Sequence, residues 1–424
     1  MNFPFRGLVF LFSLMAASAA FSESSLSNPT AELGYQNSFL LGSDSNRAVG
    51  SNPTLLTRSL FYFQPAWAPS FRIGDRTFET QMKVRAWLDT IPGGFQSEFS
   101  LRNFSVSTAQ SQWRLVAGFQ EIVWGETFGF PVLDLVSPRD FRDPLLLDAN
   151  WVRLPTASLN AQYFYGQTTV QLVITPFARS PVFPNSGSPV DPTLGTPGVS
   201  LRNTSGTDLG GIAGAEFGGK LSHLFSNGMD VGLIYFHHWN RNPVFRISPT
   251  SPPGTFLVLP TEQKVETLGF TFSASFDSWV IRSDQAVHLN QPLQTGTLGT
   301  VSNGAQWQNV LGADYTGTDE WSLGIQLQTT LQIWDGGTLA QKWASGRMTK
   351  KWFDGKVEAE LFVLSGLDNP DLWLQPKLTW NWGDSWSLAL RADWIAYKGG
   401  APSRGNLWIV RDQSRLLSWL TYKL

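Results

Sequence analysis

One segment of this 424-residue chain gathers charged side chains that could act together. Between Gly125 and Pro155 it holds five acidic and three basic residues, which are Glu126, Asp134, Arg139, Asp140, Arg142, Asp143, Asp148 and Arg153. Carboxylates and guanidinium groups form strong charge-assisted hydrogen bonds, and facing pairs in a narrow passage create a local electric field. These residue types therefore predict electrostatic selection at a constriction, with no bond made or broken.

Side chains that could support catalysis are few and badly spaced. The four histidines are His223, His237, His238 and His288. On a strand, His237 and His238 point to opposite faces and cannot share a site, and the same holds for Ser222 and His223. The chain has no cysteine, no G-x-S-x-G motif and no phosphate-binding loop. We therefore predict no enzyme activity, no cofactor and no metal site.

The amino-acid composition indicates what kind of structure must position the charged segment. Lys and Arg number 31 against 33 Asp and Glu, so the net charge of −2 argues against nucleic acid as a partner. Hydrophobic residues make up 42% and charged residues only 15%, where a soluble domain carries about 25% charge. The long charge-free stretches 154–178 and 285–313 are rich in Gln, Asn, Thr and Pro. The polar side chains among these would lack hydrogen-bond partners in a lipid-exposed helix, so neither stretch is predicted to be a membrane-spanning helix.

Hydrophobicity alternates with a period of two residues. In 320–334, one face reads Trp321, Leu323, Ile325, Leu327, Thr329, Leu331 and Ile333, and the other carries Ser, Gly, Gln and Thr. The stretches 77–91, 372–382 and 386–396 repeat the pattern, often with Trp at the ends. Runs of about 10–14 residues exceed ordinary strands and suit tilted membrane strands. We predict an all-β fold, a transmembrane antiparallel β-barrel of about 16 strands within a range of about 14–18.

The two ends of the chain indicate how the barrel reaches its membrane. Arg6 precedes the apolar run 8–20, and Ala17-Ser18-Ala19 forms a cleavage site, so residues 1–19 read as a signal peptide. A short membrane anchor is the alternative. Residues 20–424 are then one barrel domain. At the other end Leu416, Ser418, Leu420, Tyr422 and Leu424 share one face, like the terminal strand that the barrel assembly machinery recognises, although such strands usually end in Phe or Trp.

The connections between the predicted strands differ in length. Short ones carry Gly, Asn and Asp, as in Ser226-Asn227-Gly228 and Gly383-Asp384-Ser385. Long ones include 179–208, 241–263, 290–305 and 398–412. Short turns on one side and long loops on the other are typical of outer-membrane barrels.

The segment 124–156 breaks the alternation. It contains three prolines before residue 145 and many apolar residues, among them Phe128, Phe130, Leu133 and Phe141. We predict a loop folded into the lumen, with apolar residues on the wall and a charged constriction made by the eight residues named first. One helical turn at 139–143 would put the two arginines on one flank and the two aspartates on the other. A solvated extracellular loop is the alternative.

The same segment resembles a widespread family of proteobacterial outer-membrane barrels of unknown function. The shared pattern is W-G-x-x-x-G followed by D-x-x-x-P-x-D-x-R-D-P, carried here by Trp124, Gly125, Gly129, Asp134, Pro138, Asp140, Arg142, Asp143 and Pro144. A weaker resemblance links the chain to alginate-export and substrate-specific porin barrels. The first family has no agreed activity, so the resemblance implies the fold alone.

The sequence therefore predicts a channel in the outer membrane of a Gram-negative bacterium, for diffusion of small polar or amphipathic solutes. Outer-membrane lipid, the barrel assembly machinery and small solutes are the expected partners, and the oligomeric state is open. A sheath or scaffold for a partner protein, such as an electron conduit or an export complex, is the second hypothesis. An outer-membrane lipid hydrolase is the third.

Overall fold

The computed structural model describes residues 26–40, 58–91, 94–127, 130, 132–143, 145, 149–184, 193, 198–201, 209–242, 244–250, 253–295, 299–315, 317, 320–368, 371–396, 407, 410 and 414–424. The expected signal peptide, residues 1–19, lies outside the described residues.

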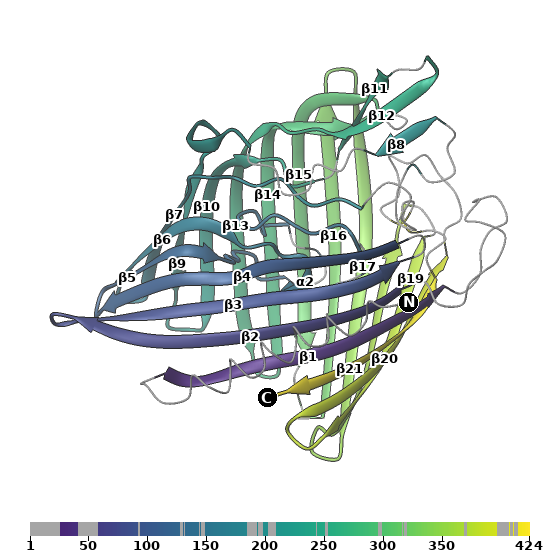
Figure 1. Cartoon of the computed structure of the whole chain (residues 1–424). Coiled ribbons are helices and arrows are strands. Elements are labelled where there is room, and N and C mark those ends of the chain that lie inside the picture. Colours follow the sequence, from purple (N-terminus) through teal and green to yellow (C-terminus); the bar gives the residue numbers. More distant parts are fainter. Residues whose placement is uncertain are drawn as a thin grey trace.

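Eighteen strands form one closed antiparallel ring, so the predicted all-β barrel is confirmed (Figure 1). Each strand pairs with the next along the chain, and the last strand pairs with the first. The strands are β1 (Leu26–Leu40), β2 (Arg58–Ile73), β3 (Arg76–Ile91), β4 (Gly94–Gln110), β5 (Trp113–Gln120), β6 (Thr156–Tyr165), β7 (Thr168–Thr175), β9 (Glu216–Leu224), β10 (Met229–Trp239), β13 (Lys264–Phe276), β14 (Trp279–Gln294), β15 (Val301–Tyr315), β16 (Trp321–Trp334), β17 (Gly337–Trp352), β18 (Val357–Gly366), β19 (Leu372–Trp382), β20 (Trp386–Ala396) and β21 (Arg415–Lys423).

The strand number of about 16 is wrong, because the barrel has 18 strands. Two strands are hard to recognise by length, since β5 and β7 have only 8 residues each. A tilted membrane strand is expected to need about 9–11 residues. In addition, β6 and β7 are joined by only two residues, 166–167, inside the charge-free stretch 154–178, where alternating charge cannot mark the inward face.

The two faces of the wall are inverted relative to a water-soluble protein. On β16, Ile325 and Leu327 are 53% and 55% exposed, whereas the intervening Gln326 and Gln328 are 2% and 8% exposed. Successive side chains of a strand point to opposite faces, so the apolar face is the outward one. An apolar outer wall around a polar interior suits a barrel surrounded by lipid.

Connections at one rim of the barrel are all short. They comprise 74–75, 111–112, 166–167, 225–228, 277–278, 316–320, 353–356 and 383–385, and we call this edge the short-turn rim. Gly228 and Gly383 have positive φ angles of 81° and 59°, which glycine adopts without strain. The two expected tight turns at these glycines are therefore confirmed.

The opposite rim carries the long connections, which include 121–155, 176–215, 240–263 and 397–414. Four connections on that rim are short, namely 92–93, 295–300, 335–336 and 367–371. The long loop expected at 290–305 is therefore wrong, because β14 continues to Gln294 and β15 begins at Val301. Strands β8 (Val199–Leu201), β11 (Phe245–Thr250) and β12 (Thr255–Pro260) form a separate three-stranded sheet there. The short helices are α2 (Ala149–Val152) and η1 (Gly211–Gly214). Among the described residues, no helix has the length and apolarity needed to cross a membrane.

Closure of the ring depends on β21. It pairs with β20 on one side and with β1 on the other, where Leu33 lies opposite Tyr422. In Figure 1 the yellow β21 accordingly lies beside the purple β1. The alternating strand expected at the carboxyl end is present, and its recognition by the assembly machinery stays a prediction.

Candidate functional site

The connection between β5 and β6, residues 121–155, contacts strands from distant parts of the ring. We call it the β5–β6 segment. It binds Asp284 of β14, Arg415 of β21 and Glu98 of β4. In the ring β14 is separated from both β4 and β21 by many strands. A segment that reaches all three through inward-facing side chains must pass through the enclosed interior, and we infer that it crosses the lumen.

The first half of the segment packs on an apolar part of the inner wall. Trp124 is 1% exposed, and its ring meets Phe236 of β10 edge-on with centroids 5.2 Å apart. The Trp124 indole N–H donates to Gln171 Oε1 at 2.9 Å. Leu133 is fully buried, and a Cβ on Gly269 of β13 would lie 2.6 Å from its Cδ2. Glycine at 269 therefore leaves the space that Leu133 fills.

The buried apolar cluster extends around much of the interior. It joins residues of the segment to inward-facing residues of the wall and to two residues of the 397–414 connection. Its members are Ile122, Trp124, Phe130, Val132, Leu133, Leu135, Val136, Leu145, Val173, Ile234, Phe236, Ala286, Val310, Trp343, Phe362, Trp373, Ile395, Leu407 and Val410. Burying this much apolar surface away from water holds the first half of the segment against the wall.

Asp284 fixes the start of the segment. Its carboxylate accepts the backbone N–H groups of Glu126 and Thr127 at 3.0 Å and the Thr127 hydroxyl at 2.7 Å. A Cβ on Gly125 would lie 2.9 Å from Asp284 Oδ2, so glycine permits this close approach. The Glu126 carboxylate lies 3.4 Å from the ammonium group of Lys220. Glu126 thus contributes a backbone donor and a side-chain ion pair.

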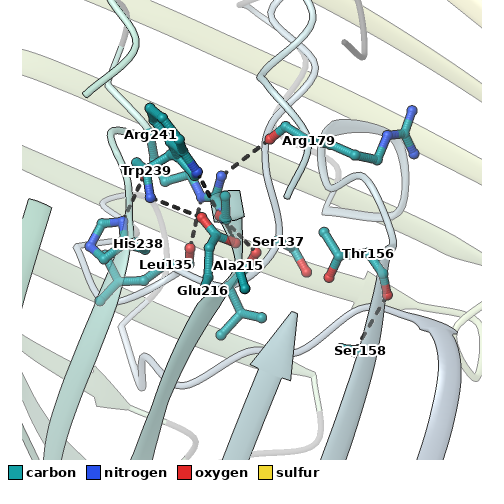
Figure 2. Close-up of polar contacts among 12 residues, drawn as sticks. Leu135, Ser137, Thr156, Ser158, Arg179, Ala215, Glu216, His238, Trp239 and Arg241 are labelled. Carbon is teal, nitrogen blue, oxygen red and sulfur yellow. Dashed lines mark hydrogen bonds and ion pairs between the residues drawn. The ribbon is translucent and has the colours of Figure 1, made fainter. Parts of the chain in front are cut away.

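Arg241, which follows β10, clamps the middle of the segment, as Figure 2 shows. Its Nε donates to the Leu135 carbonyl at 2.8 Å, and its Nη2 donates to the Val136 carbonyl at 3.0 Å. The same Nη2 donates to Glu216 Oε2 at 2.7 Å, and Glu216 is fully buried. The guanidinium therefore joins two segment carbonyls to the first residue of β9.

Asp143 anchors the second half on the far side of the ring. Its two carboxylate oxygens accept from Arg415 Nη1 and Nη2, both at 2.9 Å. Arg415 Nε also donates to Asp393 Oδ2 at 2.8 Å, and Arg391 Nη2 donates to the same oxygen at 3.0 Å. All four side chains are buried. The two carboxylates and the two guanidinium groups therefore form a buried cluster with no net charge.

Arg142 binds both within the segment and across to the wall. Its guanidinium donates to Glu98 Oε2 at 2.6 Å and to Asp140 Oδ2 at 2.5 Å, and it lies 5.2 Å from the centre of the Trp87 ring. Burial alone would lower the pKa of Arg142, but the carboxylates of Asp140 and Glu98 outweigh it and raise the pKa above its ordinary value. Arg142 keeps its positive charge.

Two further arginines lie side by side in the segment. Arg153 Nε donates to Asp134 Oδ2 at 2.6 Å, and the backbones of Arg139 and Arg153 form an antiparallel bridge. Burial and the nearby Arg153 lower the pKa of Arg139, against the attraction of Asp134. Among the described residues, Arg139 Nε has no hydrogen-bond partner. Asp148 lies outside the described residues.

The expected helical turn at 139–143 does not form. Arg139 pairs with Arg153, and Asp140 forms a parallel bridge with Val182, so this backbone is extended. The two arginines therefore have different partners rather than sharing one flank. Arg142 turns back to Asp140, two residues away, because their short separation allows a bidentate pair.

Sequence reasoning missed the partners on the wall. All six partners lie far from the segment in sequence. Asp284, Arg241, Arg391 and Arg415 bind the segment directly, whereas Glu216 binds Arg241 and Asp393 binds Arg391 and Arg415. A usable signal existed, since Asp284, Asp393 and Arg415 are charged residues at inward positions of long alternating strands. An ionised side chain inside a barrel wall needs a partner in the interior.

His237 and His238 lie on opposite faces of β10, as the alternation predicts. His238 is buried and bonds Thr267 Oγ1 at 2.7 Å, and Thr267 also bonds His288 Nδ1 at 2.7 Å. His237 points to the other face and pairs with Glu266. In the part of the chain that the structure describes, no group of three or more His, Cys, Asp or Glu side chains could hold a metal ion.

The chain has the fold of known bacterial porins. Acinetobacter baumannii OccAB1 is similar with a TM-score of 0.55 at 8% identity, covering 95% of this chain and 98% of that one. Pseudomonas aeruginosa OccK2 (OpdF) gives 0.54 at 10% identity, covering 94% and 98%. Salmonella typhi OmpF, in a complex with daunomycin, gives 0.52 at 10% identity, covering 94% and 97%. No family model and no curated protein matches the sequence.

The positions of the sequence pattern in the segment are largely its contact points. Trp124 and Gly125 lie against the wall, Asp134 and Arg142 form ion pairs, and Asp143 binds Arg415. The Pro138 carbonyl accepts the Leu154 N–H at 2.8 Å, which joins the two ends of the second half. The pattern is therefore explained by docking of the segment, whichever family it marks.

Proposed function

We propose that the protein is an outer-membrane channel for diffusion of small polar or amphipathic solutes, narrowed by the β5–β6 segment. One observation carries the proposal, namely that a single connection is fixed to β4, β14 and β21 of a closed ring. Such a segment reduces the open cross-section at its own level. The outward apolar face of the wall supports a membrane location.

The fold of the neighbours supports the same reading. OccAB1, OccK2 and OmpF are barrels of similar extent, and nearly their whole length is covered. A Gram-negative outer membrane, export by residues 1–19 and insertion by the barrel assembly machinery follow from this proposal. Transport would be diffusive, because nothing in the sequence binds a nucleotide that could drive it.

The charged side chains divide into anchors and lining. Asp143 and Arg415 are 7% and 8% exposed, so their ion pair serves to hold the segment. Arg142 and Glu98 are 26% and 37% exposed, so this pair is open to water and to passing solutes. We propose that Arg142, Glu98 and Asp140 line the passage, and that Glu126, Arg139, Asp148 and Arg153 complete the charged constriction. Asp134, whose side chain is 4% exposed, holds Arg153 in the way that Asp143 holds Arg415.

A sheath around a partner protein fits the structure less well. The apolar cluster and the ion pairs of the segment occupy the interior that an enclosed partner would need. A cytochrome or export component could not share that space without release of these contacts. A lipid hydrolase has no group of described side chains that supports it better than the channel.

The test is conductance of the refolded protein in planar bilayers. Deleting 139–144 should raise single-channel conductance severalfold, because the charged half of the constriction is removed. A deletion of equal length at 249–254, in the β11–β12 hairpin, is the matched control and should leave conductance unchanged. If the folded 139–144 variant conducts like the wild type, the segment does not narrow the passage. If the wild type forms no channel, the function itself is wrong.

A further inference from the structure

A groove of about 640 Å³ crosses the outward face of strands β17 to β21. Ala359, Pro376 and Ala392 are its small lining residues. Leucines stand beside them, and Leu390 and Leu416 are 49% and 45% exposed. Lys350, Glu360, Lys377 and Arg391 also border the groove, and the rest of its lining is apolar. This part of the outer wall is therefore indented, while most of that wall is covered by large side chains.

Pro376 explains the indentation. Proline has no N–H to donate, so it interrupts the ladder of a strand that has neighbours on both sides. Pairing between β19 and β20 accordingly runs from Leu374–Trp394 directly to Lys377–Arg391. The two neighbouring alanines add no bulk. A local break in pairing and three small residues together produce the groove.

The groove crosses the strands at right angles, because Met348–Leu361, Leu361–Pro376 and Ala392–Leu416 in its lining are direct cross-strand pairs. One end of the groove is at Lys350, two residues before β17 ends at the short-turn rim. The other end is at Leu416, the second residue of β21, and β21 runs from there to the short-turn rim. Four strand spacings of about 4.8 Å give a length of about 19 Å. Half of a hydrocarbon core about 30 Å thick is about 15 Å. Because membrane strands tilt by about 35–45°, the groove is oblique to the bilayer normal, and one acyl chain lying along it matches its length.

The end of the groove at the rim carries two opposite charges. The Lys350 ammonium lies 4.7 Å from the centre of the Trp321 ring and 6.0 Å from that of Trp352. It forms an ion pair with Glu320, whose side chain is 66% exposed against 14% for Lys350. Indole rings favour the level of lipid headgroups. A cation and an accessible carboxylate thus stand side by side where a headgroup would lie.

We propose that this groove binds one phospholipid with a phosphoethanolamine headgroup, drawn from the leaflet at the short-turn rim. Its phosphate pairs with Lys350, its ammonium pairs with Glu320, and one acyl chain lies in the groove over Ala359, Pro376 and Ala392. The zwitterionic headgroup is chosen by charge complementarity, since a purely anionic headgroup would leave Glu320 facing a negative charge. The proposal rests on the membrane location proposed above.

The test is native mass spectrometry of the protein released from micelles containing dioleoyl phosphatidylethanolamine or dioleoyl phosphatidylglycerol. The wild type should retain one phosphatidylethanolamine in preference to phosphatidylglycerol. Ala392→Trp fills the groove and should abolish retention of both lipids. Ala313→Trp, the same change on the outward face of β15, should retain the lipid as the wild type does.

Charge changes test the headgroup. Lys350→Gln should weaken retention of either lipid about fivefold, as expected for about 1 kcal/mol from one lysine at a lipid surface. Glu320→Gln should weaken retention of phosphatidylethanolamine but not of phosphatidylglycerol. The preference for phosphatidylethanolamine should then disappear. Lys356→Gln, at the same rim outside the groove, should change neither.

Three outcomes would overturn the proposal. Equal retention by Ala392→Trp would make the bound lipid ordinary boundary lipid. An equal effect of Glu320→Gln on both lipids would refute the phosphoethanolamine headgroup. Dimers that disappear in Ala392→Trp would make a second copy the occupant. Because these variants lie outside the lumen, unchanged channel conductance in them separates failure of this proposal from failure of the channel function.

Discussion

The two halves of the β5–β6 segment are held by different forces. Residues 121–137 bury Trp124 and Leu133 in an apolar cluster, and Asp284 and Arg241 bind their backbone groups. Ion pairs also join Glu121 to Arg102, Glu126 to Lys220 and Asp134 to Arg153. Residues 138–155 are held chiefly by ion pairs, of which Asp143–Arg415 is buried. Hydrophobic packing tolerates small shifts, whereas a buried ion pair requires both partners in place. The first half therefore combines apolar packing with ion pairs, whereas the second half depends chiefly on ion pairs.

The largest expected loss of stability comes from Asp143→Ala. It leaves the buried Arg415 with Asp393 alone and should lower the free energy of unfolding by about 4 kcal/mol. Thermal unfolding in detergent, followed by the heat-dependent gel shift, measures it. The double variant Asp143→Ala with Arg415→Met should recover much of the loss. Equal destabilisation of the single and double variants would show that packing, rather than charge, holds this half.

Leu133→Ala probes the first half in the same measurement. The side chain is fully buried against Gly269, so its truncation leaves a cavity and should cost about 3 kcal/mol. Salt should not change this loss. Leu327→Ala, on the exposed outer wall, is the control and should cost far less in detergent. If ion selectivity changes while stability does not, the division between the two halves is wrong.

Asp284→Asn tests the carboxylate of β14 that binds the start of the first half. The variant keeps a carbonyl acceptor but loses the charge that receives the N–H groups of Glu126 and Thr127, so about 2 kcal/mol should be lost. Increased open-channel noise should accompany it, because the start of the segment is loosened. Asn309→Ala, on the outward face of β15, serves as the comparison. If Asp284→Asn has the stability and open-channel noise of the wild type, burial of apolar side chains alone is enough to hold the first half.

Arg142→Ala should have the smallest effect on stability, less than about 1 kcal/mol, because the pair with Glu98 is partly exposed. Its effect on selectivity should be clear. Removing the cation leaves Asp140 and Glu98 unbalanced, so the reversal potential in a salt gradient should shift toward cations. Arg347→Ala, which removes the partner of Glu360 away from the segment, is the matched control. An identical shift in both variants would exclude a special role for Arg142.

The alternation of apolar and polar residues was sufficient to predict the strands of the barrel wall, but not the contacts inside the barrel. The runs 372–382 and 386–396 coincide with β19 and β20, because alternation between lipid and water acts on every residue of a strand. The strand number was wrong because β5 and β7 are short and uncharged stretches mark no inward face. The density of charged residues in the segment predicted a constriction there, and that role stays a prediction. The partners of these residues were not predicted, since Arg415 is 272 positions from Asp143 and only closure of the ring brings them together.

The position of Arg415 in β21 sets an order on biogenesis. The last strand made both seals the cylinder against β1 and supplies the guanidinium that receives Asp143. Until that strand is in place, the second half of the β5–β6 segment lacks Arg415, although Arg142 can already bind Glu98 of β4. Closure of the ring and the final fixing of the segment are therefore coupled, so a barrel arrested before β21 would be both open and less firmly narrowed.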